Sequence, residues 1–167
     1  MNNITRHSVI NYGGICSIKL INIDNVLSVN TVVNDTEYKM SVTLKTGTDW
    51  INIYFTPDTE NFNESEKITD NSSYWMQKLE FSIPKDRQPV IKELRNQSFT
   101  RLMALIEYDN GDEVVVGTPY NPLIKSNKRN ISDIGTNLYN ILLESKSEFP
   151  AYFYFDDSGD SGSGSAS

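Results

Sequence analysis

Apolar and polar side chains alternate over several stretches of the chain, and this pattern predicts β-strands. In residues 38–45, and again in residues 73–83, an apolar side chain occupies nearly every second position. A period of two places one face of a strand on a core and the other in solvent or against a partner. The positions predicted to supply the core of these and the neighbouring strands are Met40, Val42, Leu44, Ile51, Ile53, Leu79, Phe81, Leu102, Ala104, Ile106, Val114 and Val116.

Turn residues divide the apolar segments and predict how the strands connect. Residues 99–108 and 113–117 flank Asn110-Gly111, and Asn-Gly between apolar runs is the strongest short signal for a β-hairpin. We expect a second antiparallel hairpin between residues 38–45 and 50–55, joined by the short polar turn between them.

The first apolar segment, residues 15–29, is expected to form two strands or one bent strand. Asp24-Asn25 interrupts it and reads as a turn. Cys16 lies in the apolar part of this segment, so we expect it to be a small core residue.

One short helix is predicted, over residues 85–96. Asp86 can cap its N-terminus, and Pro89 falls in the first turn, where the missing N–H is harmless. Residues 137–145 fit helix or strand by periodicity alone. The β-rich context and the aromatic segment 150–155 that follows favour a strand.

Two further segments are polar and complete the predicted organisation. Residues 57–73 are acidic and are predicted to form a long exposed loop. Residues 156–167 contain only Asp, Ser, Gly and Ala and cannot bury apolar surface by themselves. We therefore expect an N-terminal arm (1–14), one β-rich domain (15–155) and this tail. The expected fold class is mainly β with one short helix (α+β), as an antiparallel β-sandwich or barrel.

Composition supports this fold class and narrows the chemistry. The chain has three Ala, whereas 56 of its 167 residues are the β-branched and aromatic types that suit strands. One His and one Cys exclude an intrachain disulfide and a zinc site of several His or Cys ligands. The net charge of −7 argues against a general nucleic-acid binder. The longest basic cluster, Lys125–Arg129, reads as a solvated loop rather than a phosphate site.

No pattern in the sequence predicts a catalytic, metal-binding or cofactor-binding site, so we expect a protein that is not an enzyme. His7 lies in a polar arm and is expected to be a surface residue rather than a catalytic base. Asp109 and Asp112 form a carboxylate pair, but a glycosidase-like pair needs an apolar pocket that raises one pKa. Residues 156–160 lack the spacing and closing Glu of a calcium loop. No secretory signal and no transmembrane helix are expected.

Three groups of segments carry a resemblance to a known family. The first is Tyr12–Ile18, where a glycine pair opens a strand. The second is the series 81–87, 94–99, 105–112 and 116–119, and the third is Pro150–Tyr154. Together they resemble small virion proteins of tailed phages that infect Bacteroidetes, including the crAss-like phages. The resemblance spans roughly residues 12 to 155.

This resemblance implies a tail-tube-like or ring protein in the phage neck or tail, a portal-to-tail connector around the DNA channel. The implied location is the virion, after assembly in the cytoplasm of the bacterial host. The implied partners are further copies in a homo-oligomeric ring, twelvefold in first preference and sixfold as the alternative, and other neck, portal and tail proteins. Genomic DNA would pass through without specific binding, and no membrane is involved. The resemblance carries over no catalytic residue.

Exposed strand edges and extended arms are the features with which ring protomers contact one another. The candidate subunit-interface residues are His7, Tyr12, Tyr120, Tyr152, Tyr154, Asp156, Asp157 and Asp160. The candidate lumen or ring–ring contacts are Glu64, Glu66, Asp109, Asn110 and Asp112. Acidic side chains in a lumen would keep DNA from adhering.

Two other functions are weighed against this one. A glycan-binding β-sandwich would use Trp50, Trp75 or Tyr152 as an exposed, coplanar platform, so burial of these rings would count against it. A carboxylate-based hydrolase would need a deep pocket with two close, buried carboxylates.

Removing residues 156–167 is expected to leave the fold intact and weaken assembly, because a tail of Asp, Ser, Gly and Ala adds nothing to the core and is expected to act as an arm on neighbouring copies. Circular dichroism and sedimentation velocity on the truncated and full chains measure the two effects. Unchanged assembly would refute the role of the tail as an arm.

Overall fold

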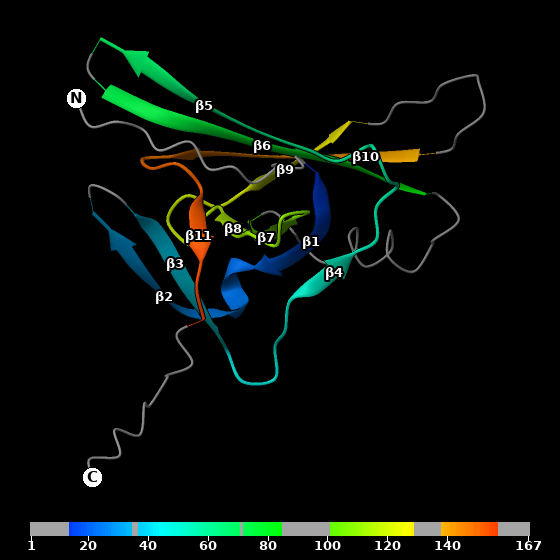
Figure 1. Cartoon of the computed structure of the whole chain (residues 1–167), viewed down its shortest axis with the longest axis horizontal. Helices are drawn as coiled ribbons and strands as arrows, with labels where there is room; N and C mark the ends of the chain where they lie inside the picture. Colours follow the sequence, from blue (N-terminus) through cyan, green and yellow to red (C-terminus); the bar gives the residue numbers. More distant parts are fainter. Residues whose placement is uncertain (1–13, 35–36, 71, 85–100, 129–137, 157–167) are drawn as a thin grey trace.

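The computed structural model describes residues 14–34, 37–70, 72–84, 101–128 and 138–156, and these form two packed β-sheets. The described residues contain no α-helix and one 3-10 turn. Figure 1 shows the smaller sheet crossing over the larger one, which curls around the lower part of the molecule. The expected mainly-β fold is therefore confirmed. The predicted helix over 85–96 lies outside the described residues.

The larger sheet is mixed and curls into a half-barrel. In spatial order its strands are β2 (Val26–Val33), β3 (Tyr38–Leu44), β11 (Tyr152–Tyr154), β8 (Glu113–Val116), β7 (Leu102–Tyr108), β1 (Ile15–Asn22) and β4 (Ile51–Ile53). Neighbours run antiparallel except for β3 and β11, which are parallel. The antiparallel smaller sheet consists of β5 (Asn61–Thr69), β6 (Ser72–Pro84), β10 (Leu138–Ser147) and β9 (Ile124–Lys128).

Two hydrophobic cores lie on opposite faces of the larger sheet. The first core lies between the sheets, where Phe81 and Leu143 of the smaller sheet meet Leu102 and Ile106 of β7. The second lies inside the curl of the larger sheet and includes Met103. Successive residues of a strand point to opposite faces. β7 therefore contributes to both cores, and its first five residues are all buried.

The predicted core residues occupy the core. Nine of them are buried, and the other three pack against the two clusters while partly exposed: Val42, Leu44 and Ile51. The period-two pattern predicted only one buried face for the central strands. It missed the core residues on the opposite face, which are Met103, Leu105 and Val115.

The expected turn at Asp24-Asn25 is confirmed as η1 (Ile23–Asn25). Its N-terminal Asn22 accepts a hydrogen bond from the Asp24 N–H (2.9 Å). β1 and β2 then diverge to different positions in the same sheet. Cys16 is exposed, so the expectation that it is a core residue was wrong. A register shift between Ile15 and Ser17, opposite β7, accounts for this, because a bulge turns a side chain away from its expected face.

The predicted hairpin between residues 38–45 and 50–55 was also wrong. β3 pairs with β2 and β11, whereas β4 pairs with β1. Met40 belongs to the core inside the curl and Ile53 to the core between the sheets. Since the two strands serve opposite cores, they cannot lie side by side with a shared apolar face.

The loop predicted over residues 57–73 was wrong as well. Most of it forms β5, which pairs with β6 along its whole length (Figure 1). Phe62 packs against the core between the sheets, and the acidic side chains Glu60, Glu64 and Glu66 lie before or along this strand. Charged residues are common on edge strands because they discourage pairing with other chains. The polarity of this segment therefore marks a sheet edge rather than a loop.

Leu102→Ala and Leu105→Ala are each expected to lower the free energy of unfolding by about 2–5 kcal/mol, because both side chains are buried, on opposite faces of β7. Leu27→Ala is the matched control; its side chain is 65% exposed, so the change should stay within about 0.5 kcal/mol. Urea unfolding in dilute solution measures the free energy of unfolding of all three variants. A negligible effect of Leu105→Ala would contradict the second core.

Candidate functional site

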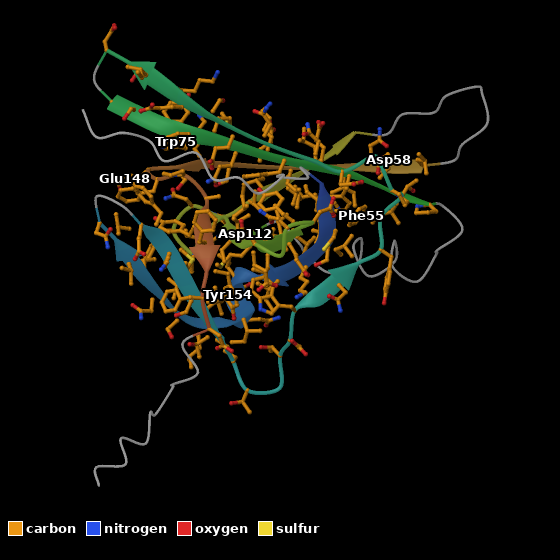
Figure 2. The ribbon with its side chains drawn as sticks, viewed as in Figure 1. Phe55, Asp58, Trp75, Asp112, Glu148 and Tyr154 are labelled. Carbon is orange, nitrogen blue, oxygen red and sulfur yellow. The ribbon has the colours of Figure 1, made fainter. Side chains whose placement is uncertain are left out.

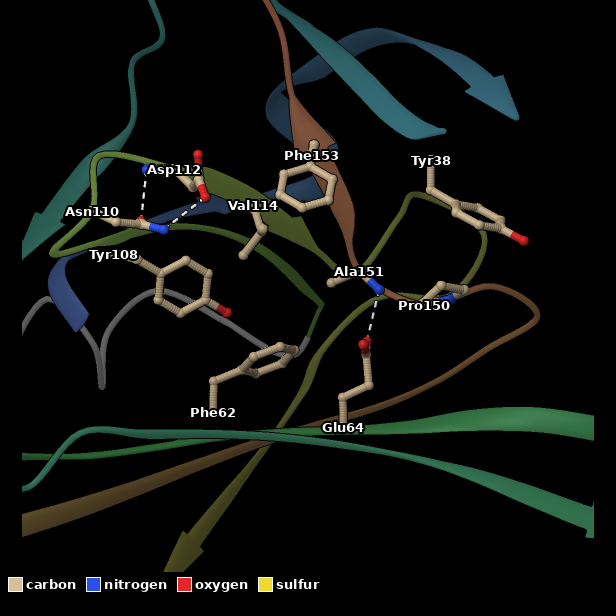
Figure 3. Close-up of a pocket in the computed structure, with 10 residues that line it drawn as sticks. All are labelled: Tyr38, Phe62, Glu64, Tyr108, Asn110, Asp112, Val114, Pro150, Ala151 and Phe153. Atoms are coloured by element: carbon tan, nitrogen blue, oxygen red, sulfur yellow. Dashed lines mark hydrogen bonds between the residues drawn. The ribbon is translucent and has the colours of Figure 1, made fainter. Parts of the chain in front are cut away.

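The space between the two sheets opens into a cavity of about 460 Å³, here called the inter-sheet cavity. Phe62 and Glu64 reach it from β5, and Tyr108 and Asp112 from the β7–β8 hairpin (Figure 3). The rings of Tyr38 and Phe153 complete its aromatic lining. The cavity thus combines four aromatic rings with two carboxylates.

Glu64 is the polar centre of the inter-sheet cavity. Its Oε2 accepts a hydrogen bond from the backbone N–H of Ala151 at 2.7 Å and another from Nε2 of Gln77 at 3.1 Å. The first bond joins the smaller sheet to the segment that leads into β11. Gln77 is 1% exposed, and its Oε1 finds no hydrogen-bond donor among the described residues. The site therefore contains a buried acceptor without a donor.

Tyr108 forms the side of the cavity opposite Glu64. Partial burial raises the pKa of its hydroxyl above the ordinary value of 10.0, and the negative charge of Glu64 raises it further. Both causes favour the neutral phenol. The Glu64 carboxylate therefore acts electrostatically on the Tyr108 hydroxyl across the cavity.

The β7–β8 hairpin forms the rim of the cavity, and its predicted turn is confirmed. Asn110 Oδ1 accepts the backbone N–H of Asp112 (3.0 Å), and Asn110 Nδ2 donates to Asp112 Oδ2 (2.8 Å). Gly111 has a φ of +85°, in the left-handed region that favours glycine. The turn chemistry of these residues thus holds one carboxylate of the cavity in place.

A second, acidic cavity of about 630 Å³ adjoins the first, because Phe62 and Tyr108 line both. Its carboxylates are Asp58, Glu60 and Asp109. Asp109 lies against Gly14, where a Cβ atom would collide with its carboxylate. Gly14 is explained by this close approach, because a larger residue would not fit there.

The structure brings together four of the five residues predicted as lumen or ring–ring contacts. Glu64, Asn110 and Asp112 line the inter-sheet cavity, and Asp109 lines its neighbour. Glu66 is exposed on β5 and lines neither. The other residues that line the inter-sheet cavity were not predicted. The alternation of Phe62 and Glu64, in the segment predicted to be a loop, could have indicated a strand there.

Four of the residues predicted at subunit interfaces lie in the described part of the chain, and they differ in exposure. Tyr120 is 87% exposed in the turn after β8, and Asp156 is exposed after β11. Tyr154 is half-buried and Tyr152 is buried, so the Tyr152 ring serves the core inside the curl. The others lie outside the described residues: His7, Tyr12, Asp157 and Asp160.

The rings proposed for a glycan platform do not form one. Tyr152 belongs to the core inside the curl, and Trp50 packs against the same core. Trp75 is half-buried on the smaller sheet, whereas β11 lies in the larger one (Figure 2). These positions count against the glycan-binding alternative by the criterion set above.

The cavity also lacks the geometry required for the hydrolase alternative, because Glu64 is only half-buried and Asp112 is exposed. Among the described residues, no three His, Cys, Asp or Glu side chains gather as a metal site. No helix formed by the described residues is long and apolar enough to cross a membrane. No family model, curated protein or solved structure matches the chain significantly.

Glu64→Gln is expected to lower the pKa of Tyr108 but leave it above the ordinary value of 10.0, because burial is the larger cause of its elevation. NMR titration of labelled tyrosine measures this, with Glu66→Gln as the matched control on the same strand. An unchanged Tyr108 pKa in Glu64→Gln would contradict the electrostatic contact.

A group whose pKa is higher in the folded than in the unfolded protein adds to the free energy of unfolding at every pH below its ordinary pKa. That contribution is lost as pH rises through the pKa of the group in the folded protein. Burial likewise raises the pKa of Tyr152 and Tyr154. The free energy of unfolding should therefore fall as pH rises above 10.0, the ordinary value for all three hydroxyls.

Proposed function

We propose that this chain is a virion structural protein of a tailed phage and has no catalytic role. In this proposal, copies of the chain form a ring in the neck or tail, between portal and tail, and genomic DNA passes through the channel without specific binding. The resemblance of residues 12–155 to virion proteins of Bacteroidetes phages supports the biological setting. The outer edge of β2 supports self-assembly and is the observation that carries the proposal.

β2 is an edge strand without the usual protection against pairing. Its eight residues, Val-Leu-Ser-Val-Asn-Thr-Val-Val, include no charge and no proline, and among the described strands it pairs with β3 alone. Leu27, Val32 and Val33 are exposed along it. Natural proteins protect edge strands with charges, prolines or short lengths, because a bare edge pairs readily with another chain.

The other three sheet edges differ from β2 in this respect. β4 has three residues. β5 carries Glu64, Glu66 and Lys67, and β9 carries Lys125 and Lys128. The contrast within one molecule favours β2 as the edge that another chain completes by adding a strand. Ring protomers need such a contact, since head-to-tail pairing closes into a ring when the rotation between copies permits.

The acidic residues agree with a DNA conduit. The cavities and the hairpin rim bring together Asp58, Glu60, Glu64, Asp109 and Asp112 on one side of the molecule. If this side faces the channel, its charge has the same sign as the DNA phosphates and reduces adhesion. A strongly basic lumen in the assembled ring would contradict this part of the proposal.

Leu27→Lys combined with Val32→Lys is expected to abolish assembly through β2, because two charges on the edge oppose strand pairing. Sedimentation velocity should show smaller species than the unaltered chain forms at the same concentration. Thr43→Lys is the matched control, since Thr43 is exposed on β3 in the same sheet but not on its edge. Equal assembly of all three proteins would contradict the role of β2.

A further inference from the structure

We propose that the inter-sheet cavity binds a small organic cation, an ammonium group carried on an apolar or aromatic body. The cavity is formed within one copy of the chain, and the described residues that line it include none from β2. A ligand can therefore occupy it whether or not copies assemble through the β2 edge.

The lining of the cavity is mostly aromatic and apolar, with a few polar groups. The rings of Phe62, Tyr108 and Phe153 come from three different strands and line it together, and the carboxylates of Glu64 and Asp112 reach it as well (Figure 3). Small-molecule sites have this composition, and their usual volume of about 300–1,000 Å³ includes the 460 Å³ of this cavity. Aromatic rings attract ammonium groups and also pack against the apolar body that carries them.

The carboxylates around the cavity are not neutralised by ion pairs within the described part of the chain. The described lining contains two carboxylates and no base, and the adjoining acidic cavity adds those of Asp58, Glu60 and Asp109. The ion pairs among described residues use other carboxylates, those of Glu37, Glu113 and Glu144. A cation that enters the cavity is attracted by this charge, whereas an anion is repelled.

Two acceptors at the Glu64 end of the cavity also call for a donor. Gln77 lies opposite Glu64 in the register of β5 with β6, and it shares a strand face with Leu79 and Phe81 of the core between the sheets, so its side chain points into the same space. It is 1% exposed, and its Oε1 has no hydrogen-bond donor among the described residues.

The Glu64 carboxylate has the same deficit at one of its oxygens. Both of its hydrogen bonds, from Gln77 and from the Ala151 N–H, end on Oε2, so Oε1 receives none from the described residues. Buried acceptors nearly always have donors in folded proteins, and an ammonium group carries only donors. The ligand class is therefore set by the aromatic lining, the negative charge and the acceptors together.

Three probes of similar shape test the inference on the full chain: phenylethylammonium, the neutral phenylethanol and the anionic phenylpropionate. Each is titrated near neutral pH and followed by NMR of the labelled protein. The ammonium probe should bind at least about tenfold more tightly than the alcohol, because it alone gains charge-assisted hydrogen bonds. It should shift the signals of the Ala151 amide and the Tyr108 ring, and the anion should not bind.

Two double variants separate this site from general attraction to an acidic protein. Glu64→Gln with Asp112→Asn removes the charge of the cavity and keeps its shape, so affinity for the ammonium probe should fall to that for the alcohol. Glu66→Gln with Asp49→Asn is the matched control, because these carboxylates line neither cavity, and it should leave the affinity unchanged.

Circular dichroism checks that both double variants fold. Asp112→Asn alone changes an exposed position at the rim and leaves the bonded Glu64 in place. It should weaken binding of the ammonium probe by part of the loss seen in the double variant, which keeps the inference testable if the double variant does not fold.

Equal affinity for the ammonium probe and the alcohol, an equal loss in both double variants, or no binding of the ammonium probe would each overturn the inference. Blocked lysine, with acetyl and methylamide ends, should bind more weakly than phenylethylammonium because its stem has no ring. Tighter binding of blocked lysine would assign the cavity to a side chain of another protein instead. None of these results changes the assembly expected of the chain, so the proposed ring is tested separately.

Discussion

Burial of β7 and β8 on both faces is the constraint on which the rest of this structure depends. Leu102, Ala104 and Ile106 point into the core between the sheets, whereas Met103 and Leu105 point into the core inside the curl. A strand buried on both sides needs a layer on each. The smaller sheet supplies one layer. The other comes from the larger sheet itself, which curls so that β2, β3 and β11 cover the second face.

The same constraint positions the candidate site. The β7–β8 hairpin extends beyond the core and carries Tyr108 and Asp112 to the open side of the space between the sheets. β5 lies across from it and carries Phe62 and Glu64. The bond from the Ala151 N–H to Glu64 joins the two layers at this point. The cavity is thus the place where the two layers separate, and polar groups occur there because the apolar layer ends.

Local features of the fold could be predicted from the sequence, and long-range ones could not. The alternation through Leu79 and Phe81 and the turn at Asn110-Gly111 depend on neighbouring residues, and both are confirmed. The pairing of β3 with β11 depends on which core each strand serves, and no local spacing encodes that. For the site, the acidic residues could be selected by their chemistry. Tyr108 and Gln77 could not, since the packing of the two sheets brings Tyr108 to Glu64 and the register of β5 with β6 places Gln77 opposite it.

The central claim is the proposal that the chain is a protomer of a closed ring, which the uncharged edge of β2 favours. Native mass spectrometry of the unaltered full chain over a range of concentrations, with negative-stain microscopy of the same samples, tests this most directly. The account predicts one species with a fixed whole number of copies, seen as a ring with a central channel. A chain that stays monomeric at the highest concentration would contradict it.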